Sequence, residues 1–104
     1  MTSAFDVSDE AIRDLGQIWE HCAERDIRVA DETHKRIKTI ILEIVVKHPR
    51  SGRLRPEFGS QVHSFAIAPY VVFYRARRRR VEVLRVLHGH RDIYPPLMSL
   101  FAAG

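Results

Sequence analysis

The most regular pattern of side chains lies in the second half of the chain. Residues 62–68 and residues 81–88 each fall into two alternating sets, which is the two-residue period of a strand with two different faces. Between them, residues 70–74 are β-branched or aromatic throughout, which favours a buried central strand. Pro69 cannot donate to a strand ladder and marks the first connection, while residues 75–80 form the second. The pattern predicts an antiparallel meander of three strands.

The start of the chain predicts a strand that leads directly into a helix. Residues Ala4–Val7 show a short apolar–polar alternation, and Ser8 follows as a helix N-cap with two acidic residues in the first turn. Over residues 9–25, apolar side chains recur with the spacing of one helical face, at Ile12, Leu15, Ile18, Trp19 and Cys22. Gly16 weakens this helix, so we expect it to mark close packing against a neighbouring element.

A second helix is predicted from Asp26, as its N-cap, to about residue 48, just before Pro49. Residues 37–46 are so rich in β-branched side chains that they also suit a strand. The polar side chains favour the helix, because they recur at alternating spacings of four and three residues, at Glu32, Arg36, Thr39, Glu43 and Lys47. The rest of the circumference is apolar. We therefore expect this helix to lie between the first helix and the sheet.

Residues 49–60 carry two prolines, two glycines and three arginines, which predicts a loop. The helical pair brings the chain back to the end of the sheet at which it began. The first strand is therefore expected to pair antiparallel with residues 62–68. A chain of 104 residues suits one core. The sequence thus predicts a single two-layer α+β domain over residues 1–104, with a helical hairpin on one face of an antiparallel four-stranded sheet in the order β-α-α-β-β-β.

A two-layer domain leaves one face of its sheet uncovered, and the last predicted strand indicates which one. Leu84 and Val86 form an apolar face suited to the core. On the opposite face Arg85 lies between Val83 and Leu87, and a central guanidinium needs solvent or an anion. An alternative is that Arg85 lies over a tyrosine of the neighbouring strand. A basic residue flanked by apolar ones on an open sheet face predicts a docking groove.

Composition limits the class of protein. Hydrophobic residues at 45% and charged residues at 29% are ordinary for a globular domain and exclude a disordered or fibrous chain. The formal net charge of +4 favours an acidic partner, either nucleic acid or an acidic protein segment. The single cysteine, Cys22, has no internal disulfide partner and suits a buried helix position. Since the sequence shows neither a targeting segment nor an apolar run that spans a bilayer, we expect a cytoplasmic protein.

Five arginines fall within residues 75–80, at the predicted second turn of the meander. Such a cluster neutralises phosphates and releases counterions, which favours nucleic-acid binding. A solvated turn is the alternative, since no aromatic side chain lies among the arginines to stack on a base. A dedicated nucleic-acid-binding module is disfavoured, because neither predicted helix has a basic face. The sequence leaves both roles of the turn open.

Three segments carry a more specific pattern. The last strand ends in RVLHGHRD over residues 85–92, residues 48–58 are HPRSGRLRPEF, and residues 64–75 are SFAIAPYVVFYR. In this order they resemble the last strand, the loop after the helical hairpin and the central hairpin of the ParE/RelE superfamily of bacterial type II toxins. The resemblance covers about half the chain and is closest to the ParE branch. One difference is Ala68-Pro69, where the family often has a glycine near the turn.

The resemblance implies a toxin that a cognate antitoxin holds inactive. Such an antitoxin is a small protein with an acidic, amphipathic C-terminal tail, which would lie along the open face of the sheet. The residues that this implies for antitoxin binding are Tyr70, Val72, Tyr74, Val83, Arg85 and Leu87. ParE toxins inhibit DNA gyrase. The residues implied for target binding are His88, His90, Arg91, Tyr94, Leu97 and Phe101.

RelE toxins instead cut messenger RNA on the ribosome, and only they are enzymes. RNA cleavage needs cations for the phosphate and groups that move protons. This alternative assigns the cationic role to Arg85 and Arg91, and proton transfer to Tyr94 and His90. Against it, residues 62–68 contain no lysine, arginine or carboxylate. We expect neither a cofactor nor a metal site, because no cluster of cysteines or carboxylates supports the histidines.

Overall fold

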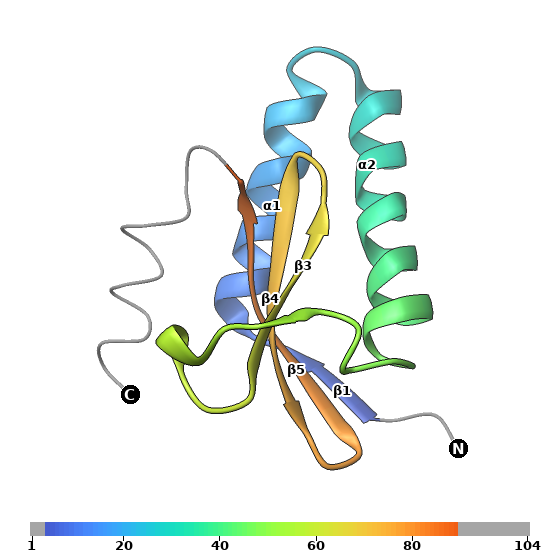
Figure 1. Ribbon diagram of the computed structural model, residues 1–104. Coiled ribbons are helices and arrows are strands. Elements are labelled where there is room, and N and C mark those ends of the chain that lie inside the picture. Colours follow the sequence, from blue (N-terminus) through green and yellow to red (C-terminus); the bar gives the residue numbers. More distant parts are fainter. Residues whose placement is uncertain (1–3, 90–104) are drawn as a thin grey trace.

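Two helices pack on one face of a mixed β-sheet in the computed structural model, which describes residues 4–89 (Figure 1). The helices are α1 (Asp9–Ala23) and α2 (Ile27–Ile40), with a π-helical segment, η1 (Ile41–Val45), after α2 and a 3-10 turn, η2 (Pro56–Phe58), further on. The strands are β1 (Ala4–Val7), β2 (Arg53–Leu54), β3 (Val62–Ile67), β4 (Tyr70–Arg77) and β5 (Arg80–His88). Their spatial order is β1-β5-β4-β3-β2. The predicted α+β class is confirmed, whereas the predicted antiparallel four-stranded sheet is wrong.

The first strand lies at the opposite edge of the sheet from the one predicted. β1 pairs parallel with β5, with Val7 opposite Val83, and not antiparallel with β3. The edge of β3 is taken by β2, in which Arg53 lies opposite Ser64. The segment predicted as a plain loop therefore supplies an edge strand. With β2 on the β3 edge of the meander, β1 pairs with the other edge, which is β5.

Both predicted helix N-caps are confirmed. The Ser8 hydroxyl accepts a hydrogen bond from the Ala11 amide at 3.0 Å, and the Asp26 carboxylate accepts one from the Arg28 amide at 2.8 Å. The β-branched residues after α2 continue the helical course as η1 and do not form a strand. The prediction for Gly16 is wrong, because no atom of a neighbouring element lies within 4 Å of the position that a Cβ would take.

The core lies between the helices and one face of the sheet. On β4 this face carries Tyr70, Val72 and Tyr74, all buried. They pack with buried residues of both layers, which are Ala11, Ile37, Ile41, Val45, Val46, Ile67, Val81, Val83 and Val86. The prediction that these three residues and Val83 lie on the open face is wrong. Both alternating sets of β4 are rich in apolar residues, so the pattern alone does not distinguish the two faces.

A β-bulge in β5 changes which of its residues face the helices. β5 pairs with β4 through Val83 and then through Arg85, so Leu84 is an extra residue in the ladder. Val83 and Val86 therefore both reach the core, which a regular two-residue alternation does not allow. The predicted core face of this strand is right for Val86 and wrong for Leu84, which is half-buried outside the core cluster.

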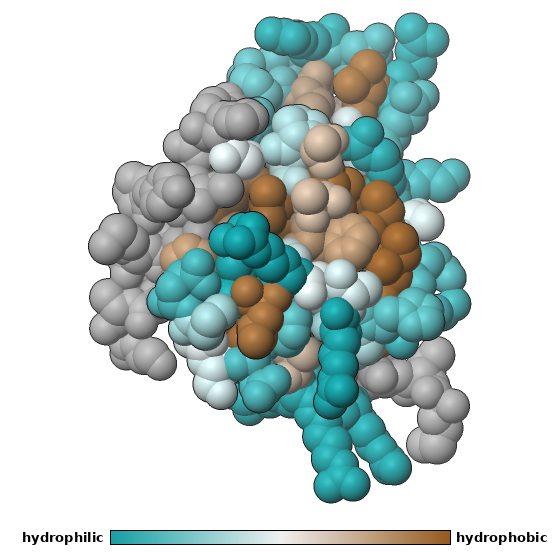
Figure 2. All heavy atoms as spheres, viewed as in Figure 1, coloured by the Kyte–Doolittle hydropathy of each residue, from teal (hydrophilic) through white to brown (hydrophobic). Residues whose placement is uncertain are grey.

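The face of the sheet away from the helices carries a smaller apolar cluster. Phe73 and Leu87 are buried there and pack with the partly buried Phe58 and Val71. The ring of Phe58 meets that of Phe73 edge-on, with centroids 5.8 Å apart. Figure 2 is seen from this side and shows apolar side chains gathered in the middle of the face, between hydrophilic ones. Of the predicted open-face residues, Leu87 lies in this cluster.

Candidate functional site

An apolar groove of about 500 Å³ lies between β1 and the two helices. Its lining is mainly apolar, with two nitrogen-bearing side chains, and consists of Phe5, Val7, Ile12, Leu15, Gly16, His34, Lys38, Ile41 and Leu42. Phe5 remains 44% exposed, Ile12 56% and Leu42 37%, so large side chains line the groove without being covered. Such a concave apolar surface suits the apolar side chains of another molecule.

Helix geometry and Gly16 together keep this groove open. Ile12 and Leu15 are three residues apart on α1 and so share one face of the helix. Gly16 follows them without a side chain, and the space that a Cβ would enter there is empty. The expected close packing at this glycine fails for that reason. The position borders the groove and leaves room in it.

The surroundings of the groove carry positive charge and a free strand edge. Lys38 lines the groove, and no carboxylate is among the described residues that do so. On β1, the Asp6 carboxylate accepts a hydrogen bond from Arg80 Nε at 2.7 Å, and this bond lowers the pKa of Asp6. Within residues 4–89, β1 pairs only with β5, so its outer edge offers backbone donors and acceptors. An extended segment that pairs there lies beside the groove.

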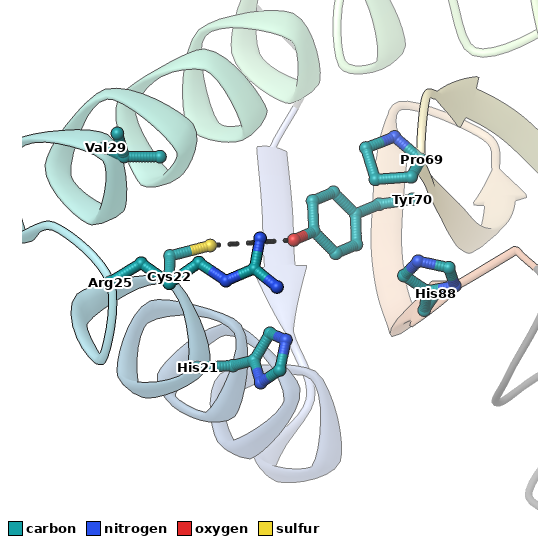
Figure 3. A pocket seen from close by; sticks show the side chains of 7 residues that line it. All are labelled: His21, Cys22, Arg25, Val29, Pro69, Tyr70 and His88. Carbon is teal, nitrogen blue, oxygen red and sulfur yellow. Dashed lines mark hydrogen bonds between the residues drawn. The ribbon is translucent and has the colours of Figure 1, made fainter.

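A second pocket, of about 510 Å³, lies where α1 ends and β5 reaches its last residue. Figure 3 shows its lining residues, which are His21, Cys22, Arg25, Val29, Pro69, Tyr70 and His88. The Tyr70 hydroxyl lies 3.7 Å from Cys22 Sγ, and the Tyr70 ring meets the His88 ring edge-on at 5.9 Å. Of the residues predicted to bind the target, His88 therefore lines a pocket. The others lie outside the described residues, namely His90, Arg91, Tyr94, Leu97 and Phe101.

Arg85, which was predicted to need solvent or an anion on the open face, binds an anion from within the fold. Its Nε donates to Asp14 Oδ2 at 2.7 Å and its Nη2 to Asp14 Oδ1 at 2.9 Å, which makes a bidentate pair. The Arg85 side chain is only 17% exposed and that of Asp14 only 7%. Arg85 thus links β5 to α1. The residues predicted for antitoxin binding are therefore not brought together on one open face.

Of the four candidates for RNA cleavage, Arg85 alone lies within the described residues, and it is paired with Asp14. β3 carries no lysine or arginine, and its His63 ring stacks on Tyr74 with centroids 5.3 Å apart. The alternative site therefore depends on Arg91, Tyr94 and His90, outside the described residues. Over residues 4–89, no group of three histidine, cysteine or carboxylate side chains is placed to hold a metal ion. In the same part of the chain, the helices are too short or too polar to cross a membrane.

Comparison with known proteins agrees with this fold. Residues 5–93 match the family described as the ParE toxin of the type II toxin-antitoxin system parDE. Toxin ParE3 of Caulobacter vibrioides is 27% identical over 85 residues, which cover 82% of this chain and 78% of that protein. The chromosomal ParDE TA system from P. aeruginosa has a similar fold, with a TM-score of 0.71 and 17% identity over 84% of this chain and 96% of the other. The toxin-antitoxin complex RelBE2 from Mycobacterium tuberculosis gives a TM-score of 0.61 and 22% identity, over 85% and 92% of the two chains.

The matched residues define the class of protein as the toxin component of a type II toxin-antitoxin system. Within that class, the chain belongs to the ParE toxin family, because the family match spans residues 5–93. The resemblance seen in RVLHGHRD and the two other segments is thereby confirmed, including its assignment to the ParE branch. The two solved structures are similar in fold alone at these identities.

Proposed function

We propose that this ParE-family toxin inhibits DNA gyrase and that a cognate antitoxin neutralises it by occupying the groove between β1, α1 and α2. The observation that supports antitoxin docking there is an exposed apolar groove beside the outer edge of β1, with which no strand of residues 4–89 pairs. The two solved structures compared above are of toxin-antitoxin systems, which favours a protein partner of this kind. This location replaces the open sheet face, since most of the residues predicted there are buried in the core.

The occupant that fits the groove is an acidic, amphipathic segment of the antitoxin. Its apolar side chains would cover Phe5, Ile12 and Leu42 and remove their exposed surface from water. Its carboxylates would face Lys38 and a toxin whose formal net charge is +4. A helical stretch suits the groove, and an extended stretch suits the edge of β1.

Gyrase inhibition is favoured over RNA cleavage by the family and by the chemistry of the sheet. The match is to ParE toxins over residues 5–93. Among the described residues, the cation expected on the last strand is bound to Asp14, and β3 offers no cation of its own. His88, one of the residues predicted to bind the target, lines the second pocket. An inhibitor that acts by binding its target needs a binding surface but no catalytic residues.

A paired assay tests the target. Purified toxin is added to a gyrase supercoiling reaction and, separately, to ribosomes programmed with messenger RNA, using wild type and Tyr94→Phe. We expect inhibited supercoiling or trapped cleaved DNA, intact messenger RNA, and little effect of the substitution on the gyrase result. Specific RNA cleavage that is lost in Tyr94→Phe would overturn gyrase inhibition in favour of the RelE-like activity, because that substitution removes one hydroxyl and little packing.

A growth assay tests the partner. Expression of the chain alone should arrest growth, and co-expression with the adjacent open reading frame should restore it. Harmless expression of the folded chain would contradict toxicity, and continued arrest in the presence of every neighbouring reading frame would contradict a genetically linked antitoxin.

A further inference from the structure

The arginine turn, residues 75–80, comprises the end of β4, the two-residue connection and the first residue of β5, and its arginines fall into two groups. Arg75 lies 3.6 Å from Glu82, and Arg80 lies 2.7 Å from Asp6, so both are held by carboxylates of the sheet. The remaining three arginines are Arg77, Arg78 and Arg79. They are exposed and make no side-chain hydrogen bond or ion pair with the described residues. The two nearby acids are already engaged, so three guanidinium groups are available to a partner.

The backbone of this turn favours a residue other than arginine. Arg79 has a φ of +59°, in the left-handed region that glycine and asparagine adopt more easily than a long side chain does. A purely solvated turn gains nothing from arginine at that position. A left-handed arginine within an exposed, charged cluster favours a role for the side chain itself.

The position of the turn leaves it accessible. It lies at the end of the sheet opposite the connection between α1 and α2 (Figure 1). Long hydrophilic side chains project from the same end of the molecule (Figure 2). The pairing of β4 with β3 ends at Arg75, whereas β1 runs beside β5 as far as Arg80. Arg78 and Arg79 lie beyond the last β4–β5 pair, Arg77 and Arg80, and form the tip of the hairpin.

We propose that the arginine turn binds the phosphate backbone of duplex DNA through Arg77, Arg78 and Arg79. Guanidinium groups match phosphate oxygens in a bidentate manner. Arg77 ends β4 and Arg78 and Arg79 form the turn, so three exposed guanidinium groups lie on adjacent residues, which suits a continuous array of phosphates better than one carboxylate of a protein. No aromatic residue lies among them, so the binding is independent of base sequence.

This activity is separate from gyrase inhibition and from antitoxin docking, because it uses neither the groove nor the pocket around His88. The test is fluorescence anisotropy of a short labelled DNA duplex with the full chain, over a range of salt concentrations. The variant replaces Arg77, Arg78 and Arg79 by glutamine. A matched control replaces three exposed basic residues elsewhere, Arg13, Lys35 and Arg50, and so loses the same charge.

Three phosphate contacts contribute about −2.7 to the slope of log affinity against log salt. We expect the variant of the turn to lose most of that slope and about tenfold or more in affinity at moderate salt, while the control keeps both. Circular dichroism should show that both are folded. Equal losses in the two variants, or none in the turn variant, would overturn the proposal. Equal or tighter binding of a duplex RNA or of an acidic peptide, with the same dependence on the turn, would also overturn it.

Discussion

Asp14 of α1 and Arg85 of β5 form a bidentate ion pair that lies almost entirely out of solvent. The two N–H···O bonds measure 2.7 and 2.9 Å, and the same carboxylate accepts a third hydrogen bond, from the Val86 amide, at 3.0 Å. β1 covers the edge of β5 only as far as Val83. Asp14 therefore accepts the hydrogen bond of a β5 amide that β1 does not reach, and it holds α1 against the sheet.

The ion pair predicts a large loss of stability when one partner is removed. Asp14→Ala leaves a mostly buried guanidinium and a strand amide without their acceptor, and we expect the free energy of unfolding to fall by about 3 kcal/mol. Urea denaturation measures the loss. The control is Asp6→Ala, which breaks the exposed pair with Arg80 and should change stability little. An equally small effect at both positions would show that the Asp14 pair is not structural.

Two glycines in this chain predict opposite responses to alanine. A Cβ at Gly52 would lie 2.7 Å from the Ser64 carbonyl oxygen and closer still to the Tyr74 hydroxyl, so Gly52→Ala should lower stability by about 2 kcal/mol. A Cβ at Gly16 meets nothing, and Gly16→Ala should raise stability by roughly 0.5–1 kcal/mol through helix propensity. Thermal unfolding of both variants checks the contrast. The same sign at both sites would refute this account of the two positions.

The buried hydroxyl of Tyr74 predicts a loss of stability at high pH. It donates to the Pro49 carbonyl at 2.7 Å and accepts from the Gly52 amide at 3.0 Å, and burial raises the pKa of Tyr74 above its ordinary value of 10.0. Above pH about 10 the unfolded chain gives up this proton while the folded chain retains it, so stability declines as the pH rises. Denaturation of wild type and Tyr74→Phe between neutral and alkaline pH isolates the effect. Tyr74→Phe should be less stable by about 1–3 kcal/mol at neutral pH and should lack this part of the alkaline decline.

Local patterns predicted the elements well, because periodicity and capping depend on neighbours in sequence. Ser8 and Asp26 cap their helices as predicted. For the β-branched segment before Pro49, the stripe of polar side chains correctly predicted a helix instead of a strand. The pairing of β1 was not predictable in this way. It depends on β2, two residues long, taking the other edge of the meander. The bulge at Leu84 left no periodic signal either, and it reversed the assignment of Val83.

The candidate site was missed for a related reason. Asp14 and Arg85 are 71 residues apart, and no spacing indicates that they meet, so Arg85 was assigned to the open face as a docking residue. The groove did leave a signal. The second predicted helix has more apolar surface than the first helix and the sheet cover, and Leu42 is one of the apolar residues that remain exposed. Gly16 was a further signal, which was interpreted as internal packing although it marks a space.

Arg79 predicts a trade-off between stability and binding. Arg79→Gly relieves a left-handed backbone conformation at φ +59°, and we expect stability to increase by roughly 0.5–1 kcal/mol. If the side chain contacts phosphate, the same substitution should weaken binding to a DNA duplex and reduce the salt slope by about 0.9. Thermal unfolding and anisotropy are measured on the same preparation. A more stable variant with unchanged DNA binding would exclude Arg79 from the contact.

Ile12 predicts where the antitoxin binds. Its side chain is 56% exposed within the groove, so Ile12→Asp adds a charge at the protein surface and should leave the fold intact. An acidic, apolar segment that occupies the groove would lose an apolar contact and meet a carboxylate, and we expect its affinity to fall by about tenfold to a hundredfold. The matched control is Ile27→Asp, at a residue that is 61% exposed but does not line the groove. Calorimetry with the purified antitoxin should therefore show a loss at Ile12 alone, and the growth assay should show a toxin that the antitoxin no longer restrains. Equal affinities for wild type and Ile12→Asp would place the antitoxin elsewhere on the toxin.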